Sequence, residues 1–235
     1  MKGLPNATIA APADLLTIAD LDVDTVAGLR ATAERLDRDR SGATAGVDLS
    51  GRTVALLFDR PSTRTRLGFE AAAASLGGHA VALTGAEVQF GRRTETTADA
   101  ARSVSAFVDG VVARVADHAT LERFASAATV PVVNGLSDRA HPCEALADLQ
   151  SLASRFETLD GLRVAWVGDC TNVARSLASV CVLAGVDSAS RARPTTGSTT
   201  SPRATSGRSA PGRSGSSRTP SRRSTGPPSS TPTAG

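Results

Sequence analysis

The sequence is poor in aromatic residues and in cysteine. Of its 235 residues, 3% are aromatic, none is Tyr, one is Trp and three are Cys. Cys143, Cys170 and Cys181 are odd in number and show no C-x-x-C spacing, which argues against a disulfide framework or a zinc site. We therefore expect reduced thiols, no metal and no other cofactor.

Long apolar runs are also missing. No stretch approaches the roughly 18 consecutive apolar residues that a membrane span requires. Asp14 and Asp20 precede any long apolar run, so a signal peptide is not expected. These features predict a soluble, cytoplasmic protein without a membrane partner.

Residues 188–235 lack acidic residues and every apolar side chain larger than Ala or Pro. The segment uses only Ser, Thr, Arg, Pro, Gly and Ala and holds eight of the 26 basic residues, whereas all 23 acids lie in 1–187. Such a composition cannot build a core and predicts disorder. Binding of nucleic acid is not expected either, because no aromatic residue accompanies the arginines and only phosphate attraction would remain.

The composition of 188–235 also suggests its origin. All six residue types have codons with G or C at the middle position, while the body uses many residues, such as Leu, Val and Asp, that require T or A there. Arg supplies 25 of the 26 basic residues, which indicates a GC-rich genome. We therefore expect that 188–235 is a frame-shifted translation, the alternative being a genuine disordered Arg/Ser/Pro tail.

The body, 1–187, alternates short β-branched runs with longer amphipathic stretches, a pattern typical of an α/β fold with parallel sheets flanked by helices. The predicted strands are Thr53–Phe58, His79–Leu83, Gly110–Ala113, Val130–Asn134 and Arg163–Val167. The predicted helices are Asp14–Leu36, Arg64–Leu76, Asp99–Phe107, His118–Ala127, His141–Phe156 and Asn172–Ala184. We expect a first domain at 1–150 and the beginning of a second at 151–187.

The segment Ser62-Thr63-Arg64-Thr65-Arg66 lies where the first predicted strand leads into a helix. Backbone N–H groups at a helix start lack intrahelical partners, and the helix dipole adds partial positive charge there. The hydroxyl groups and Arg64 supply further donors. This junction therefore predicts a phosphate-binding site, the alternative being an ordinary helix cap with solvated arginines.

This segment resembles the carbamoyl-phosphate signature of the aspartate/ornithine carbamoyltransferase family, and further matches follow in the order of the family's motifs. Gln89 resembles a loop residue that reaches into a neighbouring subunit's site. Arg114 resembles the Arg that contacts the carbamoyl group and the phosphate. His141-Pro142-Cys143-Glu144 resembles the H-P-x-Q motif, and Asn172 stands where the family's Asn contacts the amino-acid substrate.

The resemblance implies a two-domain carbamoyltransferase fold whose second domain is incomplete here. It implies transfer of the carbamoyl group from carbamoyl phosphate to the side-chain amine of ornithine, in arginine metabolism. It also implies a homotrimer with shared sites. Arg64, Arg114 and His141 would be the catalytic residues. Ser62, Thr63, Thr65, Gln89, Pro142, Cys143 and Glu144 would join them in holding carbamoyl phosphate, and Asn172 would bind ornithine.

The choice of amino acid depends on two short motifs. His141-Pro142-Cys143 and Gly168-Asp169-Cys170-Thr171-Asn172 are closer to the ornithine branch than to the aspartate branch. Aspartate and N-acyl-ornithine carbamoyltransferases remain the alternatives within the family.

Three positions depart from the family's pattern: Glu144 replaces Gln, and Cys170 and Thr171 replace Gly and Asn. An added carboxylate near a phosphate should weaken anion binding. The family's later segments also have no counterpart in 188–235. We therefore expect this chain to bind carbamoyl phosphate weakly and not to turn over ornithine, and a non-catalytic anion-binding fragment is the second possibility.

Overall fold

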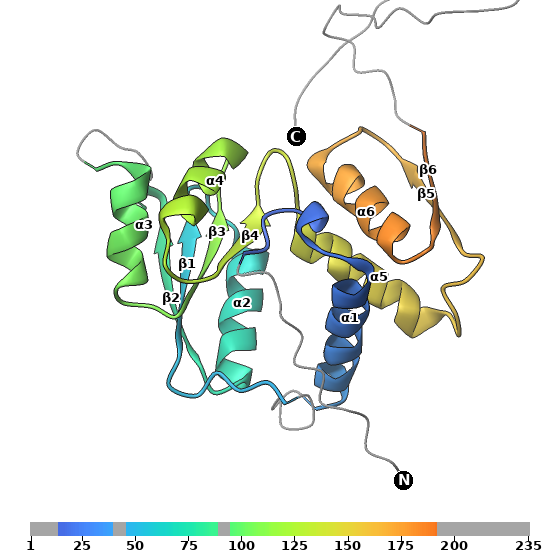
Figure 1. The fold of residues 1–235 in the computed structure, drawn as a ribbon, viewed down its shortest axis with the longest axis horizontal. Helices are drawn as coiled ribbons and strands as arrows, with labels where there is room; N and C mark the ends of the chain where they lie inside the picture. Colours follow the sequence, from blue (N-terminus) through green and yellow to red (C-terminus); the bar gives the residue numbers. More distant parts are fainter. Residues whose placement is uncertain (1–13, 40–45, 89–94, 192–235) are drawn as a thin grey trace, which may run out of the picture. The chain divides into compact units, whose positions relative to one another are not determined.

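A computed structural model describes residues 14–39, 46–88 and 95–191 of the protein. These residues all fall within one compact unit (Figure 1). The model confirms the predicted α/β class, because parallel sheets alternate with helices along the chain. No helix among the described residues is long and apolar enough to cross a membrane.

The first sheet has four parallel strands in the order β2-β1-β3-β4. The strands are β1 (Thr53–Phe58), β2 (His79–Thr84), β3 (Gly110–Arg114) and β4 (Val132–Leu136). Strand residues alternate between the two faces of a sheet. Ala55 and Leu57 accordingly pack in a core with α3 (Thr97–Ser105) and α4 (His118–Ala127). Leu56 and Phe58 pack on the opposite face, where Phe69 of α2 (Thr63–Ser75) joins them.

A second core lies around α1 (Val23–Arg38), α5 (Pro142–Arg155) and α6 (Asn172–Leu183). The helices α5 and α6 contribute Leu149 and Val180, which are almost fully buried. The short parallel sheet β5 (Arg163–Val167) and β6 (Asp187–Arg191) lies beside α6. The predicted domain boundary at 150 falls inside α5, and the division into domains stays a prediction.

The predicted helix Asp14–Leu36 is wrong over its first third. Leu15 exchanges backbone hydrogen bonds with β4, donating to Val132 O and accepting from Asn134 N, each at 2.8 Å. A short 3-10 helix, η1 (Ile18–Asp20), follows. The α-helix begins only after Asp22, whose carboxylate accepts a hydrogen bond from Thr25 N at 2.7 Å. An N-cap of this kind fixes a helix start, and it overrides the apolar periodicity that precedes it.

The expected start of disorder at Ser188 is wrong for the first four residues. Ser188–Arg191 belong to β6, which pairs in parallel with β5. Main-chain pairing needs no apolar side chain, and all five residues of β6 are exposed. The remainder of the predicted tail, 192–235, lies outside the described residues.

A second short 3-10 helix, η2 (Gly85–Glu87), follows β2.

Candidate functional site

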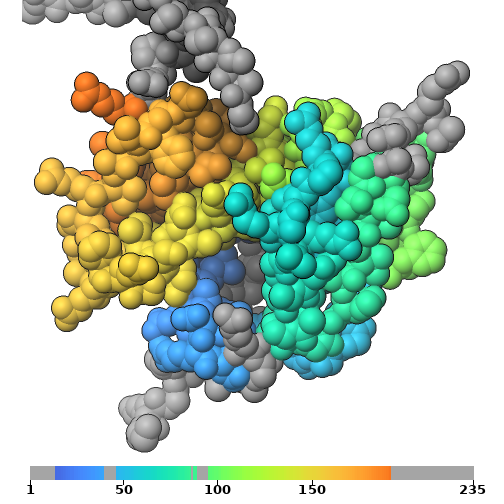
Figure 2. Space-filling model, turned by 180° about the vertical axis from the view of Figure 1, so that it is seen from behind, coloured from blue at the N-terminus to red at the C-terminus, as the bar shows by residue number. Residues whose placement is uncertain are grey.

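Three neighbouring strands of the first sheet end at the same level. Phe58 of β1 is in register with Arg114 of β3, and Arg114 is in register with Leu136 of β4. The carboxyl ends of parallel strands form the usual ligand crevice of an open α/β sheet. The segments leaving this edge lead into α2 and α5. Figure 2 shows the start of α2 (cyan) on the same face as the yellow-green segment before α5.

The N-terminus of α2 is joined to β3 through hydroxyl groups. Ser62 is the N-cap residue, yet its side chain makes no capping bond, and its Oγ donates instead to Thr65 Oγ1 at 3.0 Å. Arg114 Nη1 also donates to Thr65 Oγ1, at 3.1 Å. The structure therefore brings Arg114 to the helix start that the sequence identified as an anion site. Thr63, an exposed residue, begins the same first turn, whose N–H groups have no intrahelical partner.

The two arginines of the motif differ in their surroundings. Arg66 Nε donates to Glu70 Oε1 at 2.8 Å, which forms an ion pair along α2. Arg64 is exposed, and no ion pair with another described residue engages it. Arg64 is therefore the motif's cation that is available to an added anion.

Asp59 is a residue that the motif analysis missed. Its backbone N–H donates to Arg114 O at 3.1 Å, and its Oδ2 accepts from Ala116 N at 2.6 Å. These two bonds tie the segment after β1 to the segment after β3. Asp59 thereby fixes the edge on which Arg114 lies. Its place directly after a buried strand was the available signal.

His141 occupies the N-cap position of α5 without a side-chain capping bond, and Pro142 follows at the first helical position. Its Nε2 lies 2.9 Å from Glu144 Oε2, while its buried Nδ1 has no hydrogen-bond partner among the described residues. Burial lowers the pKa of His141 below its usual 6.5, the charge of Arg114 lowers it further, and the Glu144 carboxylate opposes both effects. The electrostatic influence of Arg114 links His141 to the α2 site.

The side chains of Pro142 and Cys143 pack against neighbouring parts of the protein. Pro142 is buried, and Cys143 Sγ lies 3.7 Å from Asn134 O. Burial raises the pKa of the Cys143 thiol to about 11. The thiol is therefore neutral near pH 7 and is not a nucleophile.

Asn172 begins α6 after the Thr171 N-cap and faces the segment that follows β4. Its Nδ2 donates to Ser137 O at 2.6 Å, and its Oδ1 accepts from Val173 N at 3.0 Å. The structure thus connects Asn172 to the loop that ends at His141. Gln89 lies outside the described residues.

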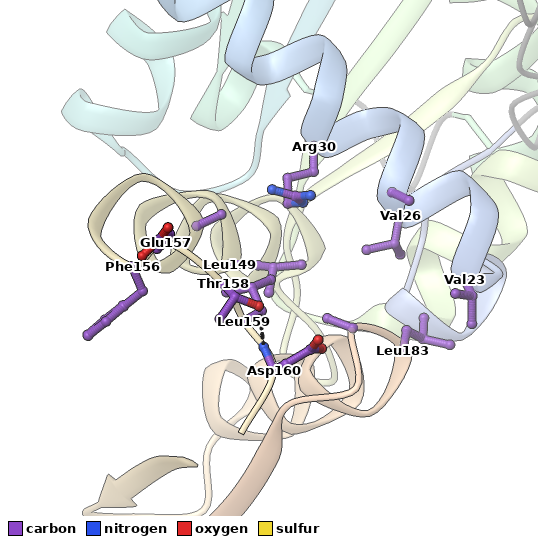
Figure 3. Close-up of a pocket in the computed structure, with 13 residues that line it drawn as sticks. Val23, Val26, Arg30, Leu149, Phe156, Glu157, Thr158, Leu159, Asp160 and Leu183 are labelled. Atoms are coloured by element: carbon purple, nitrogen blue, oxygen red, sulfur yellow. Dashed lines mark hydrogen bonds between the residues drawn. The ribbon is translucent and has the colours of Figure 1, made fainter. Parts of the chain in front are cut away.

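A separate hollow of about 340 Å³ lies between α1, the end of α5 and the end of α6 (Figure 3). Arg30, Val26 and Leu149 line it, and Thr158 Oγ1 accepts a hydrogen bond from Asp160 N at 3.1 Å at its rim. It includes none of the predicted site residues. The carboxyl edge of the first sheet therefore remains the candidate site.

Comparison with known proteins gives one consistent result. A family model described as "Aspartate/ornithine carbamoyltransferase, carbamoyl-P binding domain" matches residues 13–154. A curated ornithine carbamoyltransferase of Cenarchaeum symbiosum is 47% identical over 174 residues, which are 74% of this chain and 57% of the relative. One of Thermus thermophilus is 49% identical over 175 residues, with the same two coverages.

Solved structures agree with these relatives. The ornithine carbamoyltransferase structure from Thermus thermophilus superposes with a TM-score of 0.72 at 44% identity and covers 78% of this chain and 63% of that one. The structure from Pyrococcus furiosus gives 0.72 at 42% identity, with 77% and 58% covered. The chain thus spans 57% of the length of the two curated relatives described above.

Proposed function

This chain belongs to the aspartate/ornithine carbamoyltransferase family, and we propose that its first sheet carries a carbamoyl-phosphate site built for carbamoyl transfer to ornithine. The products are citrulline and phosphate. The observation that carries the proposal is the hydrogen bond from Arg114 to Thr65 at the N-terminus of α2. This bond holds the guanidinium group of Arg114 beside the backbone N–H groups of the helix start, which can bind an anion.

The phosphate of the substrate is assigned to the start of α2. Ser62, Thr63 and Thr65 provide hydroxyl and backbone donors there, and Arg64 provides an exposed guanidinium. Carbamoyl phosphate is already an activated ester, so the protein has to position its carbonyl carbon and stabilise the departing phosphate. Arg64 and Arg114 supply the positive charge for the second task.

The carbamoyl group is assigned to the edge between Arg114 and His141. His141 serves as a donor to the carbonyl oxygen, and Glu144 accepts from the carbamoyl NH₂ group, with Pro142 and Cys143 shaping the start of α5. Gln89 is proposed to complete the site of a neighbouring subunit in a homotrimer. This arrangement requires no metal or cofactor.

Ornithine is assigned to the region of Asn172, beside the segment after β4. The relatives bear the name ornithine carbamoyltransferase, which supports this substrate over aspartate or N-acyl-ornithine. A relative from Pyrococcus furiosus is named anabolic, which supports a role in arginine biosynthesis. A cytoplasmic location is part of the same proposal.

We propose that the 235-residue chain itself binds carbamoyl phosphate weakly and forms no citrulline. Residues 188–235 lack acids and large apolar side chains, and Ser188–Arg191 of β6 are exposed. A shifted reading frame from about codon 188 explains both observations. Translation of the DNA after codon 187 in the other two frames tests this, and the absence of an open frame with an alternating apolar pattern would refute it.

Calorimetric titration of the chain with carbamoyl phosphate tests the binding site. Arg64→Ala should abolish detectable binding, since hydrogen bonds to charged groups contribute about 1.5–3 kcal/mol each. Arg66→Ala is the matched control, because Glu70 already engages Arg66, and it should leave binding nearly unchanged. Equal losses in both variants, or no heat from the unsubstituted chain, would contradict the site. Normal citrulline formation by the chain would contradict the proposed lack of turnover.

A further inference from the structure

Three buried polar side chains below the site have no role in the proposed function. Asn134 and Ser137 are fully buried, and His118 is 4% exposed. They come from β4, the segment after β4 and the start of α4. Burying a polar group is unfavourable unless hydrogen bonds replace its water.

Ser137 Oγ is the centre of this group. It accepts hydrogen bonds from Asn134 Nδ2 at 3.1 Å and from Ala140 N at 3.3 Å, and it lies 2.7 Å from His118 Nδ1. A serine hydroxyl has one proton and two lone pairs. The hydroxyl proton has two acceptors within reach, His118 Nδ1 at 2.7 Å and Ala140 O at 3.4 Å. The shorter contact favours donation to His118 Nδ1, with the ring proton on Nε2.

The other end of the His118 ring lies near a carboxylate. Its Nε2 lies 3.5 Å from Glu122 Oε1, within ion-pair range but without hydrogen-bond geometry. The backbone N–H of His118 donates to Asp138 Oδ1 at 2.9 Å. The start of α4 is thus attached twice to the segment that follows β4.

Hydrogen bonds connect this network to the two regions proposed to bind the substrates. On the side of the proposed carbamoyl-phosphate region, Ser137 N donates to Ala140 O at 3.0 Å, and Ala140 directly precedes His141. His141 N then donates to Ser176 Oγ at 3.0 Å. Toward ornithine, the Ser137 carbonyl oxygen accepts from Asn172 Nδ2 at 2.6 Å. One residue therefore restrains the approaches to His141 and Asn172 together.

We propose that Ser137, held by His118 and Asn134, is a positioning residue that sets the places of His141 and Asn172. The proposal rests on the proposed function, because it concerns the same site. Ser137 touches neither substrate, and it acts through its side chain on the first region and through its carbonyl group on the second. The 2.7 Å contact between the Ser137 hydroxyl group and the His118 ring makes His118 part of the same arrangement.

The test compares two buried serines. Ser137→Ala removes the central hydroxyl group. Ser105→Ala is the matched control, because Ser105 is 9% exposed and its Oγ donates to Ala101 O and accepts from Thr129 N, in segments that precede the amino ends of β3 and β4. We expect Ser137→Ala to weaken carbamoyl phosphate binding by roughly tenfold, the effect of one to two lost hydrogen bonds. Ser105→Ala should lose a similar amount of stability and keep its affinity.

A second pair of variants covers the case in which Ser137→Ala fails to fold. His118→Asn retains an acceptor near the position of Nδ1, whereas His118→Leu removes it, so His118→Asn should bind carbamoyl phosphate more tightly than His118→Leu. The chain has three His residues, so the ring signal of His141 can be assigned by NMR. We expect the chemical shift of the His141 ring to change in Ser137→Ala and to stay unchanged in Ser105→Ala.

The outcomes separate the two proposals. If the unsubstituted chain binds carbamoyl phosphate and Ser137→Ala binds equally well, the positioning role is wrong while the proposed function stands. Equal weakening by Ser105→Ala, or equal binding by the two His118 variants, would also overturn it, because loss of stability alone would then explain the effect. If the unsubstituted chain gives no binding, the proposed function fails and this inference fails with it.

Discussion

The two sheets of this protein are held in different ways. In the first sheet, Leu56 and Phe58 are fully buried between helices and paired strands. In the second, Val167 of β5 is 83% exposed, and every residue of β6 is exposed. Strands of parallel sheets are normally buried on both faces and read as apolar runs. The second sheet therefore has the hydrogen-bond ladder of such a sheet, but it packs side chains of β5, Val164 and Trp166, on one face only.

This difference separates the two halves of the proposed site. The residues assigned to carbamoyl phosphate follow strands whose side chains are packed on both faces. Asn172 follows β5, and its described side-chain link to the first region is the hydrogen bond to Ser137 O. The anion half is thus supported by the core of the first sheet, whereas Asn172 begins a helix of the second core and is joined to the anion half by the hydrogen bond to Ser137 O.

Truncation of one buried side chain tests the packing difference most strongly. Leu56→Ala should lower the free energy of unfolding by about 2–5 kcal/mol, because it removes buried methyl groups and leaves a cavity. Val167→Ala in β5 should cost less than about 0.5 kcal/mol, since that side chain is already in water. Urea unfolding of both variants measures the two values. Equal losses in the two variants would contradict the proposed difference in packing.

Cysteine reactivity distinguishes the regions by burial. Cys143 lies beneath the first sheet's edge with its pKa raised by burial to about 11 from 9.0, whereas Cys170 is exposed after β5. A rise of two units reduces the thiolate fraction about a hundredfold near pH 8. Iodoacetamide should therefore label Cys170 well before Cys143, as followed by peptide mass spectrometry. Comparable labelling rates under native conditions would show that the α5 start opens readily.

Two substitutions in β6 should increase the burial of apolar side chains in the second sheet. Ser188 and Ser190 pair with Val164 and Trp166, which places them on the face toward α6, and a hollow of about 70 Å³ lies there. Ser188→Val with Ser190→Val should raise stability by about 1 kcal/mol through burial and strand propensity. Hydrogen exchange of β5 amides measures the gain. Ala165→Val, on the exposed face of β5 and outside the lining of that hollow, is the control and should give little protection.

Much of the fold was predictable because local signals and packing agree. Thr53–Phe58, His118–Ala127 and Arg163–Val167 were predicted with the bounds that the structure has. The first third of the Asp14–Leu36 prediction failed because Leu15 pairs with Val133 of β4, a contact 118 residues away that no local pattern contains. The strand at Ser188–Arg191 was missed for a related reason, since its pairing with β5 uses the backbone alone.

The site was predictable in its parts but not in its connections. The S-T-R-T-R segment indicated an anion site from helix chemistry, and the family resemblance added Arg114, His141 and Asn172. The sequence did not reveal that Arg114 would bond Thr65, or that Glu70 would engage Arg66 and leave Arg64 available. The buried set of His118, Asn134 and Ser137 carried no motif, because its hydrogen bonds depend on the packed arrangement of β4 and α4.

The smallest expected effect is a change in the pKa of His141, which lies between the first sheet and α6. Burial and Arg114 lower its pKa and Glu144 raises it, so Glu144→Gln should move its titration to lower pH, as followed by NMR. A depressed folded-state pKa favours the neutral ring, so its contribution to stability is present above pH 6.5 and is lost as pH falls through the folded-state value. That loss should be larger in Glu144→Gln. Arg114→Gln should shift the titration upward, and the His79 signal should stay in place as the internal control. A shift to higher pH in Glu144→Gln would show that the Glu144 carboxylate does not face the ring in solution.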